Sequence, residues 1–330
     1  MNNRRKFLVA LGASALAAPF ASFAQPQGKV WRVGYLVQSH MDLTDTDRYY
    51  GPFTRGMLEL GYMDGKNLRI EWRSAEGKTD LLPGLAAELV QLKADVIVTV
   101  GTPATVATQK ATTTIPIVMV GAGDPVGNGL VKSLARPGAT TTGLSNMMAD
   151  LSPKLLEMLL AMAPKVSRVA VLVNPGNLSN ALFLKNVQAA AQRINVKIVP
   201  VEARSPQEIE NAFSLAVRQN AKAIIVSLEG LFQQQKNQIV ELAAKHRLPS
   251  IAMYGDYVEA GGLISYGANL REPNRRAATY VDKILKGTKP ADLPIEQPTT
   301  LELFINGKTA KSLGLKIPQS LLISADKVIE

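Results

Sequence analysis

The stretch Ala94–Asn146, ADVIVTVGTPATVATQKATTTIPIVMVGAGDPVGNGLVKSLARPGATTTGLSN, decides the fold of this chain. Its beginning, Asp95–Val100, is a short apolar run rich in β-branched residues that ends at Gly101, which is typical of a parallel strand buried on both faces. Thr102–Pro103 then predicts the start of a helix, because a Thr hydroxyl caps helices and Pro fits the first helical position. A strand, a tight loop and a helix are therefore expected in direct succession.

A second buried strand is predicted at Ile115–Val120, and it ends in the turn Gly121–Pro125. Two neighbouring parallel strands thus end in short loops, and one loop opens a helix whose N-terminal amides attract a carboxylate or another anion. Open parallel sheets bind ligands at this edge. The plainer interpretation, in which Gly and Pro only mark turns, stays open at this point because every α/β domain has several such loops.

The same order of strands and helices occurs twice along the chain. The predicted strands are 31–37, 67–74, 95–100 and 115–120 in the first series, and 168–173, 196–201, 221–227 and 250–253 in the second. A chain of 330 residues is long enough for two domains of about 100 to 150 residues each. We therefore predict an α/β fold of two doubly wound parallel-sheet lobes joined by a multi-strand hinge, with a cleft between them. The expected lobes are residues 30–146 plus about 262–298, and 147–261 plus about 299–330.

The amino terminus has the pattern of an export signal. Arg4, Arg5 and Lys6 precede an apolar run, Val9–Phe23, and small residues lead up to Ala24, so cleavage is expected after residue 24. The paired arginines resemble a twin-arginine signal, and ordinary secretion is an equal alternative.

No other segment approaches the roughly 20 unbroken apolar residues of a membrane span, so no direct membrane insertion is expected. The chain has no cysteine, which excludes a disulfide framework, a thiolate metal site and a lipid-anchored Cys. These features predict a free periplasmic protein.

The composition is 46% hydrophobic and 19% charged, with a formal net charge of +10. The predicted signal contributes part of this positive charge. No dense basic tract with interleaved aromatic residues follows, so nucleic acid is not an expected partner and the charge is read as a solvated basic surface.

Catalytic and cofactor motifs fail on their spacing. The third glycine of Gly121–Gly127 falls one residue late for a dinucleotide fingerprint, and Gly61–Lys66 does not have the spacing of a phosphate-binding loop. No GxSxG elbow occurs in the mature chain. The only histidines are His40, in a loop, and His246, at a helix end. We therefore expect no catalytic residue, no cofactor and no metal.

Polar side chains without a nucleophile gather at the predicted strand ends. They offer hydroxyls and amides for a ligand carboxylate, and Asp or Glu for a ligand ammonium group, so a zwitterion fits the set. Tyr254 is a candidate for covering an apolar ligand side chain, although packing in the core is its plainer role. The candidates are Gln38, Ser39, Asp42, Gly101, Thr102, Asp124, Ser145, Asn146, Asn174, Ser227, Glu229 and Tyr254.

Four ordered motifs resemble the ABC transporter substrate-binding proteins of the tryptophan/tyrosine-binding type. They are VGTPA at 100–104, GDPVGNGLVKSLARPGATTTGLS at 123–145, VLVNPGN at 171–177 and the ending KGTKPADLPIEQPTTLELFINGKTAKSLGLKIPQSLL at 286–322. The resemblance covers essentially the whole mature chain. It implies a type I periplasmic binding fold whose two lobes are joined by three strands, and a permease in the inner membrane as partner. It also implies that the Thr102–Pro103 loop, Asp124, Asn146 and the loop Asn174, Pro175 and Gly176 face the cleft.

Two loops depart from the family pattern. Residues 38–47 lack the frequent acidic-His-Pro pattern and keep only Ser39–His40, and Val226–Glu229 differs from the common Thr-Asp-Asn type of loop. Both loops hold specificity positions in the family, so the ligand is left open within small polar or zwitterionic molecules such as amino acids and related carboxylates.

We therefore predict a monomeric periplasmic receptor for an ABC importer, which captures its ligand by hinge closure and carries out no catalysis. Two alternatives remain: a secreted α/β enzyme, and a ligand-sensing domain for a membrane signalling partner.

Overall fold

The computed structural model describes residues 29–41, 51–269 and 271–330. The predicted export signal, residues 1–24, and the candidate Asp42 lie outside these residues. No helix in the described part of the chain is both long and apolar enough to cross a membrane.

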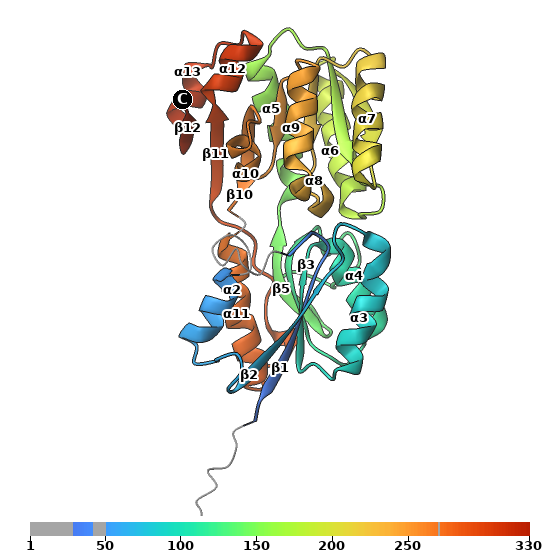
Figure 1. Ribbon diagram of the computed structural model, residues 1–330, viewed down its shortest axis with the longest axis vertical. Helices are drawn as coiled ribbons and strands as arrows, with labels where there is room; N and C mark the ends of the chain where they lie inside the picture. Colours follow the sequence, from blue (N-terminus) through green and yellow to red (C-terminus); the bar gives the residue numbers. More distant parts are fainter. Residues whose placement is uncertain (1–28, 42–50, 270) are drawn as a thin grey trace, which may run out of the picture. The chain divides into compact units, whose positions relative to one another are not determined.

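The first sheet has five parallel strands in the order β2-β1-β3-β4-β5. Helices α3 and α4 cover one of its faces, and α2 and α11 cover the other (Figure 1). This sheet and these four helices are called the first lobe. Its elements are β1 Trp31–Val37, α2 Gly51–Glu59, β2 Leu68–Ser74, α3 Leu82–Gln91, β3 Val96–Val100, α4 Thr102–Ala111, β4 Ile117–Gly123, β5 Thr141–Asn146 and α11 Arg271–Leu285.

The second sheet repeats this order as β7-β6-β8-β9-β10, and then adds β11, antiparallel to β10, and β12. The sheet with its helices is called the second lobe. Its elements are α5 Met148–Met162, β6 Arg168–Val173, α6 Ser179–Arg193, β7 Lys197–Glu202, α7 Pro206–Arg218, β8 Ala223–Val226, α8 Gly230–Gln234, α9 Lys236–Lys245, β9 Ser250–Ala252, α10 Gly255–Glu259, β10 Ile264–Ala268, β11 Leu301–Asn306, α12 Gly307–Leu313, α13 Gln319–Ser324 and β12 Lys327–Ile329.

The apolar runs of the sequence form strands whose side chains are buried on both faces of the sheet. The strand β3 is buried along VIVT, and β6 and β8 are buried along almost their whole length, as expected for parallel strands covered on both faces. The predicted α/β architecture with two parallel-sheet lobes is therefore confirmed.

The strand β5 and the helix α5, which join the two lobes, escaped the sequence analysis. The strand β5 has the sequence TTGLSN, whose Gly, Ser and Asn resemble a turn, yet Gly143 at φ +127° lies so close to β4 that a Cβ would sit 2.2 Å from the Met119 carbonyl oxygen. The sheet therefore needs glycine there. Helix α5 follows at once and carries Pro153 inside it, which hides its helical pattern.

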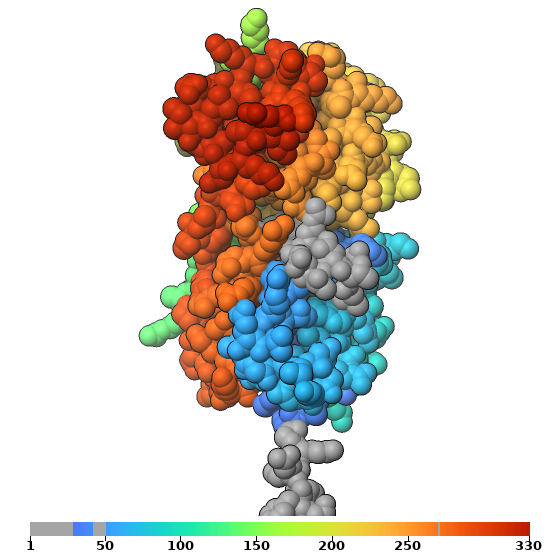
Figure 2. All heavy atoms as spheres, turned by 60° about the vertical axis from the view of Figure 1, so that its left-hand side comes forward, coloured from blue at the N-terminus to red at the C-terminus, as the bar shows by residue number. Residues whose placement is uncertain are grey.

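The chain enters the first lobe for the second time later than predicted. The strand β10 pairs with β9 and β11, so residues 264–268 belong to the second lobe and not to a first-lobe segment that begins at 262. The reason is that Leu263 and Ile264 are buried in the second lobe's core, whereas α11 buries Ala277 and Val281 in the first. Figure 2 shows α11, in orange, running beside α2, in blue.

Within the described residues the chain passes between the lobes after Asn146, after Ala268 and after Glu296. The last crossing is fixed to the first lobe. The backbone of Glu296 exchanges hydrogen bonds of 2.9 Å with Ser145 and 3.0 Å with Gly143, and Arg276 holds its carboxylate with two more, of 2.8 and 2.7 Å.

Candidate functional site

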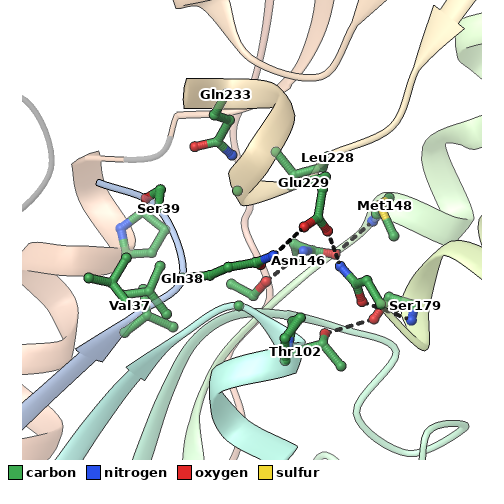
Figure 3. A pocket seen from close by; sticks show the side chains of 18 of the residues that line it. Val37, Gln38, Ser39, Thr102, Asn146, Met148, Ser179, Leu228, Glu229 and Gln233 are labelled. Atoms are coloured by element: carbon green, nitrogen blue, oxygen red, sulfur yellow. Dashed lines mark hydrogen bonds between the residues drawn. The ribbon is translucent and has the colours of Figure 1, made fainter. Parts of the chain in front are cut away.

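A cavity of about 110 Å³ lies between the two lobes, where the carboxyl ends of the parallel strands meet (Figure 3). The first lobe contributes residues in or just after the carboxyl ends of β1, β3, β4 and β5, together with the start of α11. The second lobe contributes the loop before α6, the loop after β8, and α8. The lining residues are Val37, Gln38, Ser39, Val100, Gly101, Thr102, Pro103, Val120, Gly121, Ser145, Asn146, Met148, Asn177, Ser179, Leu228, Glu229, Gly230, Gln233, Ala268, Pro273, Asn274 and Pro298.

The carboxylate of Glu229 is the only charged side chain among the described lining residues. The amide Nδ2 of Asn177 donates to its Oε2 at 2.6 Å, and the amides of Gln38 and Asn174 donate to its Oε1 at 2.7 and 3.1 Å. The backbone N–H of Leu231 also donates to it. Burial raises the pKa of Glu229, and these hydrogen bonds to the charged form oppose the rise. Because Gln38 belongs to the first lobe, this carboxylate also joins the lobes.

A second contact between the lobes centres on the hydroxyl of Ser179, at the start of α6. Its Oγ donates to the Gly123 carbonyl at 3.0 Å, and accepts from Thr102 Oγ1 at 2.7 Å and Asn128 Nδ2 at 3.1 Å. The Gly123 N–H in turn donates to Thr102 Oγ1 at 3.0 Å. One donor and two acceptor sites are all that a serine hydroxyl offers, so its capacity is filled.

The role of Thr102 differs from the one expected. Helix α4 is capped by Gly101, at φ +82°, and Thr102 is its first residue, so the hydroxyl does not cap the helix but joins the lobes. Pro103 stays within the first turn. The start of α4 lines the cavity, and the N–H groups of Thr102 and Ala104 have no partner inside the helix; Pro103 has no N–H, and the Thr105 N–H donates to the Gly101 carbonyl.

Most of the sequence-predicted residues line the cavity. They are Gln38, Ser39, Gly101, Thr102, Pro103, Ser145, Asn146 and Glu229. Asn146 is at the same time a hinge residue, because its Nδ2 donates to the Gly121 carbonyl at 2.6 Å and its Oδ1 accepts from the Met148 N–H at 3.0 Å.

The first three residues of the loop after β6 do not line the cavity, although Asn177 of the same loop does. Asn174 is buried and reaches the site only through Glu229, whereas Pro175 and Gly176 are exposed and do not line the cavity. Asn174 Oδ1 accepts from the Gly176 N–H at 2.9 Å, which closes this loop as a turn.

Three further candidates do not line the cavity. Asp124 is a turn residue at φ +37°, whose Oδ1 accepts from the Gly127 N–H at 3.0 Å. Tyr254 is buried in the second lobe, where its hydroxyl donates to the Phe232 carbonyl at 3.1 Å. Ser227 is fully buried at the end of β8, and its Oγ has no hydrogen-bond partner.

Sequence reasoning missed several lining residues. Ser179 is not among the candidates, and Asn274 lies far along the chain although its Oδ1 accepts from the Tyr35 hydroxyl at 2.6 Å. Gln233 stands in a run of three glutamines, and nothing in the sequence separates it from Gln234 and Gln235. The fold alone decides which of the three faces the cavity.

In the part of the chain that the structure describes, no group of three or more His, Cys, Asp or Glu side chains could hold a metal ion. What the arrangement offers is a small enclosed space with hydrogen-bonding groups on both sides and apolar walls, which is a binding site for a small molecule.

Two α/β lobes with such a cavity between them define a two-lobed solute-binding protein of the type I periplasmic binding fold. The family described as ABC transporter substrate binding protein matches residues 39–329, so the chain belongs to this family. The resemblance carried by the sequence motifs is thereby confirmed.

Individual relatives agree with this assignment. A tyrosine-binding protein of Clostridioides difficile is 26% identical over 276 residues, which are 84% of this chain and 78% of that protein. A solved structure from Vibrio cholerae, described as a conserved domain protein, is 27% identical with a TM-score of 0.85, covering 91% of this chain and 100% of that one. A domain from Streptococcus pneumoniae in complex with L-Trp is 26% identical with a TM-score of 0.83, covering 91% of this chain and 99% of that one.

Proposed function

We propose that the protein is an exported receptor of the periplasm, which captures an amino acid or a related zwitterion between its lobes and presents it to an ABC permease. Membership of a substrate-binding family supports the receptor role and the permease as partner. The N-terminal sequence pattern supports export, by the general secretion route or the twin-arginine route. The protein is proposed to act as a monomer.

The observation that carries the ligand class is the unbalanced charge of Glu229. The amides of Gln38, Asn174 and Asn177 are neutral, so they orient the carboxylate without cancelling its charge. No Lys or Arg occurs among the described lining residues. A buried negative charge in a small cavity favours a ligand that carries an ammonium group.

The start of α4 complements this charge. Its free backbone amides and the positive end of the helix dipole favour a carboxylate. An ammonium group near Glu229 and a carboxylate near Thr102 together describe an α-amino acid. The names of two relatives, one a tyrosine-binding protein and one a complex with L-Trp, point to the same class.

A thermal-shift screen of the mature protein, unfolded and refolded to remove carried-over ligand, tests this proposal. The panel contains tyrosine, tryptophan, phenylalanine and leucine, with myo-inositol, allitol and a purine base as other classes. A ligand at about 100 times its dissociation constant adds about 2.7 kcal/mol, a shift of several degrees. We expect shifts from amino acids only. A shift from a polyol or a purine alone, or from none of the panel, would contradict the proposal.

A further inference from the structure

The polar side chains of the cavity differ in whether the protein itself already uses them. Gln38, Glu229 and Asn177 are hydrogen-bonded to one another or to neighbours, and Thr102 and Ser179 satisfy each other across the lobes. Asn146, Asn274 and Ser145 are also engaged. Their hydrogen bonds are largely made within the protein, so these groups mainly shape the cavity; the exception is the Glu229 carboxylate, whose partners are neutral amides and which can still attract a cationic group.

Ser39 and Gln233 are the exceptions. Among the described lining residues, they are the only polar side chains that make no hydrogen bond within the chain. Ser39 follows β1 in the first lobe, and Gln233 lies on α8 in the second. In Figure 3 both lie on the same side of the contact between Gln38 and Glu229, away from Thr102 and Ser179.

The surroundings of this pair are apolar. Val37 lies two residues before Ser39, Leu228 lies below α8, and Pro273 and Ala268 also line the cavity. A polar group of the ligand that reaches Ser39 and Gln233 must therefore sit at the end of an apolar body. The amide of Gln233 offers a donor and an acceptor, and the Ser39 hydroxyl offers both as well, which complements a hydroxyl better than a group that only donates.

We infer that Gln233, assisted by Ser39, determines ligand specificity by binding a hydroxyl at the far end of an amino acid with an apolar side chain. This inference rests on the proposed function and deepens it, because it assigns the end of the ligand that lies away from Glu229. A site that hydrogen-bonds a ligand hydroxyl disfavours the analogue without it, since the site's own polar groups are then left unpaired.

The test compares tyrosine with phenylalanine, which differ by one hydroxyl, by calorimetric titration of the refolded mature protein. We expect the wild type to bind tyrosine about five- to tenfold more tightly than phenylalanine, as one net hydrogen bond implies. Gln233→Met keeps the length of the side chain and removes its hydrogen bonds, so the preference should fall to below twofold, and Ser39→Ala should reduce it in part. Gln235→Met is the matched control, because Gln235 is in the same glutamine run but does not line the cavity.

The ratio of the two affinities is measured on the same protein sample, so any loss of folded protein cancels. A preference that survives in Gln233→Met, or a wild type that binds both ligands equally, would overturn the inference and leave the proposed function standing. A wild type that binds neither tyrosine nor phenylalanine, nor any other amino acid of the screen, would contradict the proposed function itself.

Discussion

Gly123 is a position where the fit between the lobes is sensitive to one added carbon. It ends β4 in the first lobe, and a Cβ built there would lie 2.8 Å from both the Cβ and the Oγ of Ser179 in the second lobe. Carbon atoms in good contact are about 3.5 to 4.0 Å apart. Gly123 does not have a positive φ, so alanine is compatible with its own backbone. Gly123→Ala therefore acts as a wedge between the lobes.

The size of the effect follows from the cost of overpacking. Forcing an extra methyl group into a packed contact costs about 1 to 3 kcal/mol, which is a 5- to 150-fold increase in a dissociation constant. The clash with Ser179 exists only while the lobes touch, so most of its cost falls on ligand capture; the added Cβ would also lie 3.2 Å from Asn146 Oδ1 in the same lobe, a milder contact. The free energy of unfolding of the ligand-free protein should change by less than about 0.5 kcal/mol.

Calorimetric titration with tyrosine and urea unfolding measure the two quantities. Gly84→Ala is the control, because Gly84 lies in α3 with no atom within 4 Å of an added Cβ. The double variant Gly123→Ala, Ser179→Gly removes the opposing Cβ and should recover part of the affinity. Wild-type affinity in Gly123→Ala would refute the reasoning, and so would a loss of stability as large as the loss of binding.

Three other substitutions separate the roles of charge, hinge and turn. Glu229→Gln should weaken amino-acid binding about tenfold or more in calorimetry. Because burial raises the pKa of Glu229, the wild type should also lose stability relative to this variant as the pH rises above the ordinary pKa of 4.5. Parallel pH profiles of stability for the two proteins would contradict this. Hydrogen bonds from Arg276 lower the pKa of Glu296, so Glu296→Gln should lower the free energy of urea unfolding by about 0.5 kcal/mol at neutral pH. The difference between the two proteins should disappear as the pH falls through the lowered pKa of Glu296. A difference that persists in acid would show that the ion pair is not its source. Asp124→Ala should cost about 1 kcal/mol of stability and change the dissociation constant of the ligand by less than about twofold. A loss of affinity at unchanged stability would instead show that Asp124 binds the ligand.

Much of the fold could be predicted because the central strands of each lobe are buried on both faces. Runs such as VIVTV and RVAVLV leave no doubt about their structure, and the repeated order of elements implies two lobes. The assignment of β10 failed for a physical reason. Its residues ISYGA mix buried and partly exposed positions, a pattern that fits either sheet, and only the pairing with β9 and β11 decides between them.

The part of the candidate site that lies at the ends of strands could be predicted from the sequence. Gln38, Thr102 and Glu229 lie within three residues of a strand's end, and parallel strands bring such positions to one edge of the sheet. Asp124 and Tyr254 also follow strands, yet the first is used in a turn and the second in packing, because a side chain's direction depends on the loop that carries it. Residues on helices, such as Gln233, give no signal in the sequence.

The central claim is that a ligand held between the lobes brings them together, and a distance across the cleft tests it most directly. The chain contains no cysteine, so Lys78→Cys and Gln207→Cys introduce the only two labelling sites. Both positions are exposed, lie on opposite lobes and line one groove between them. Spin labels or fluorophores there report the separation of the lobes. We predict that saturating tyrosine shifts the distribution to a shorter, narrower distance; an unchanged distribution, in protein that binds tyrosine by calorimetry, would contradict the account.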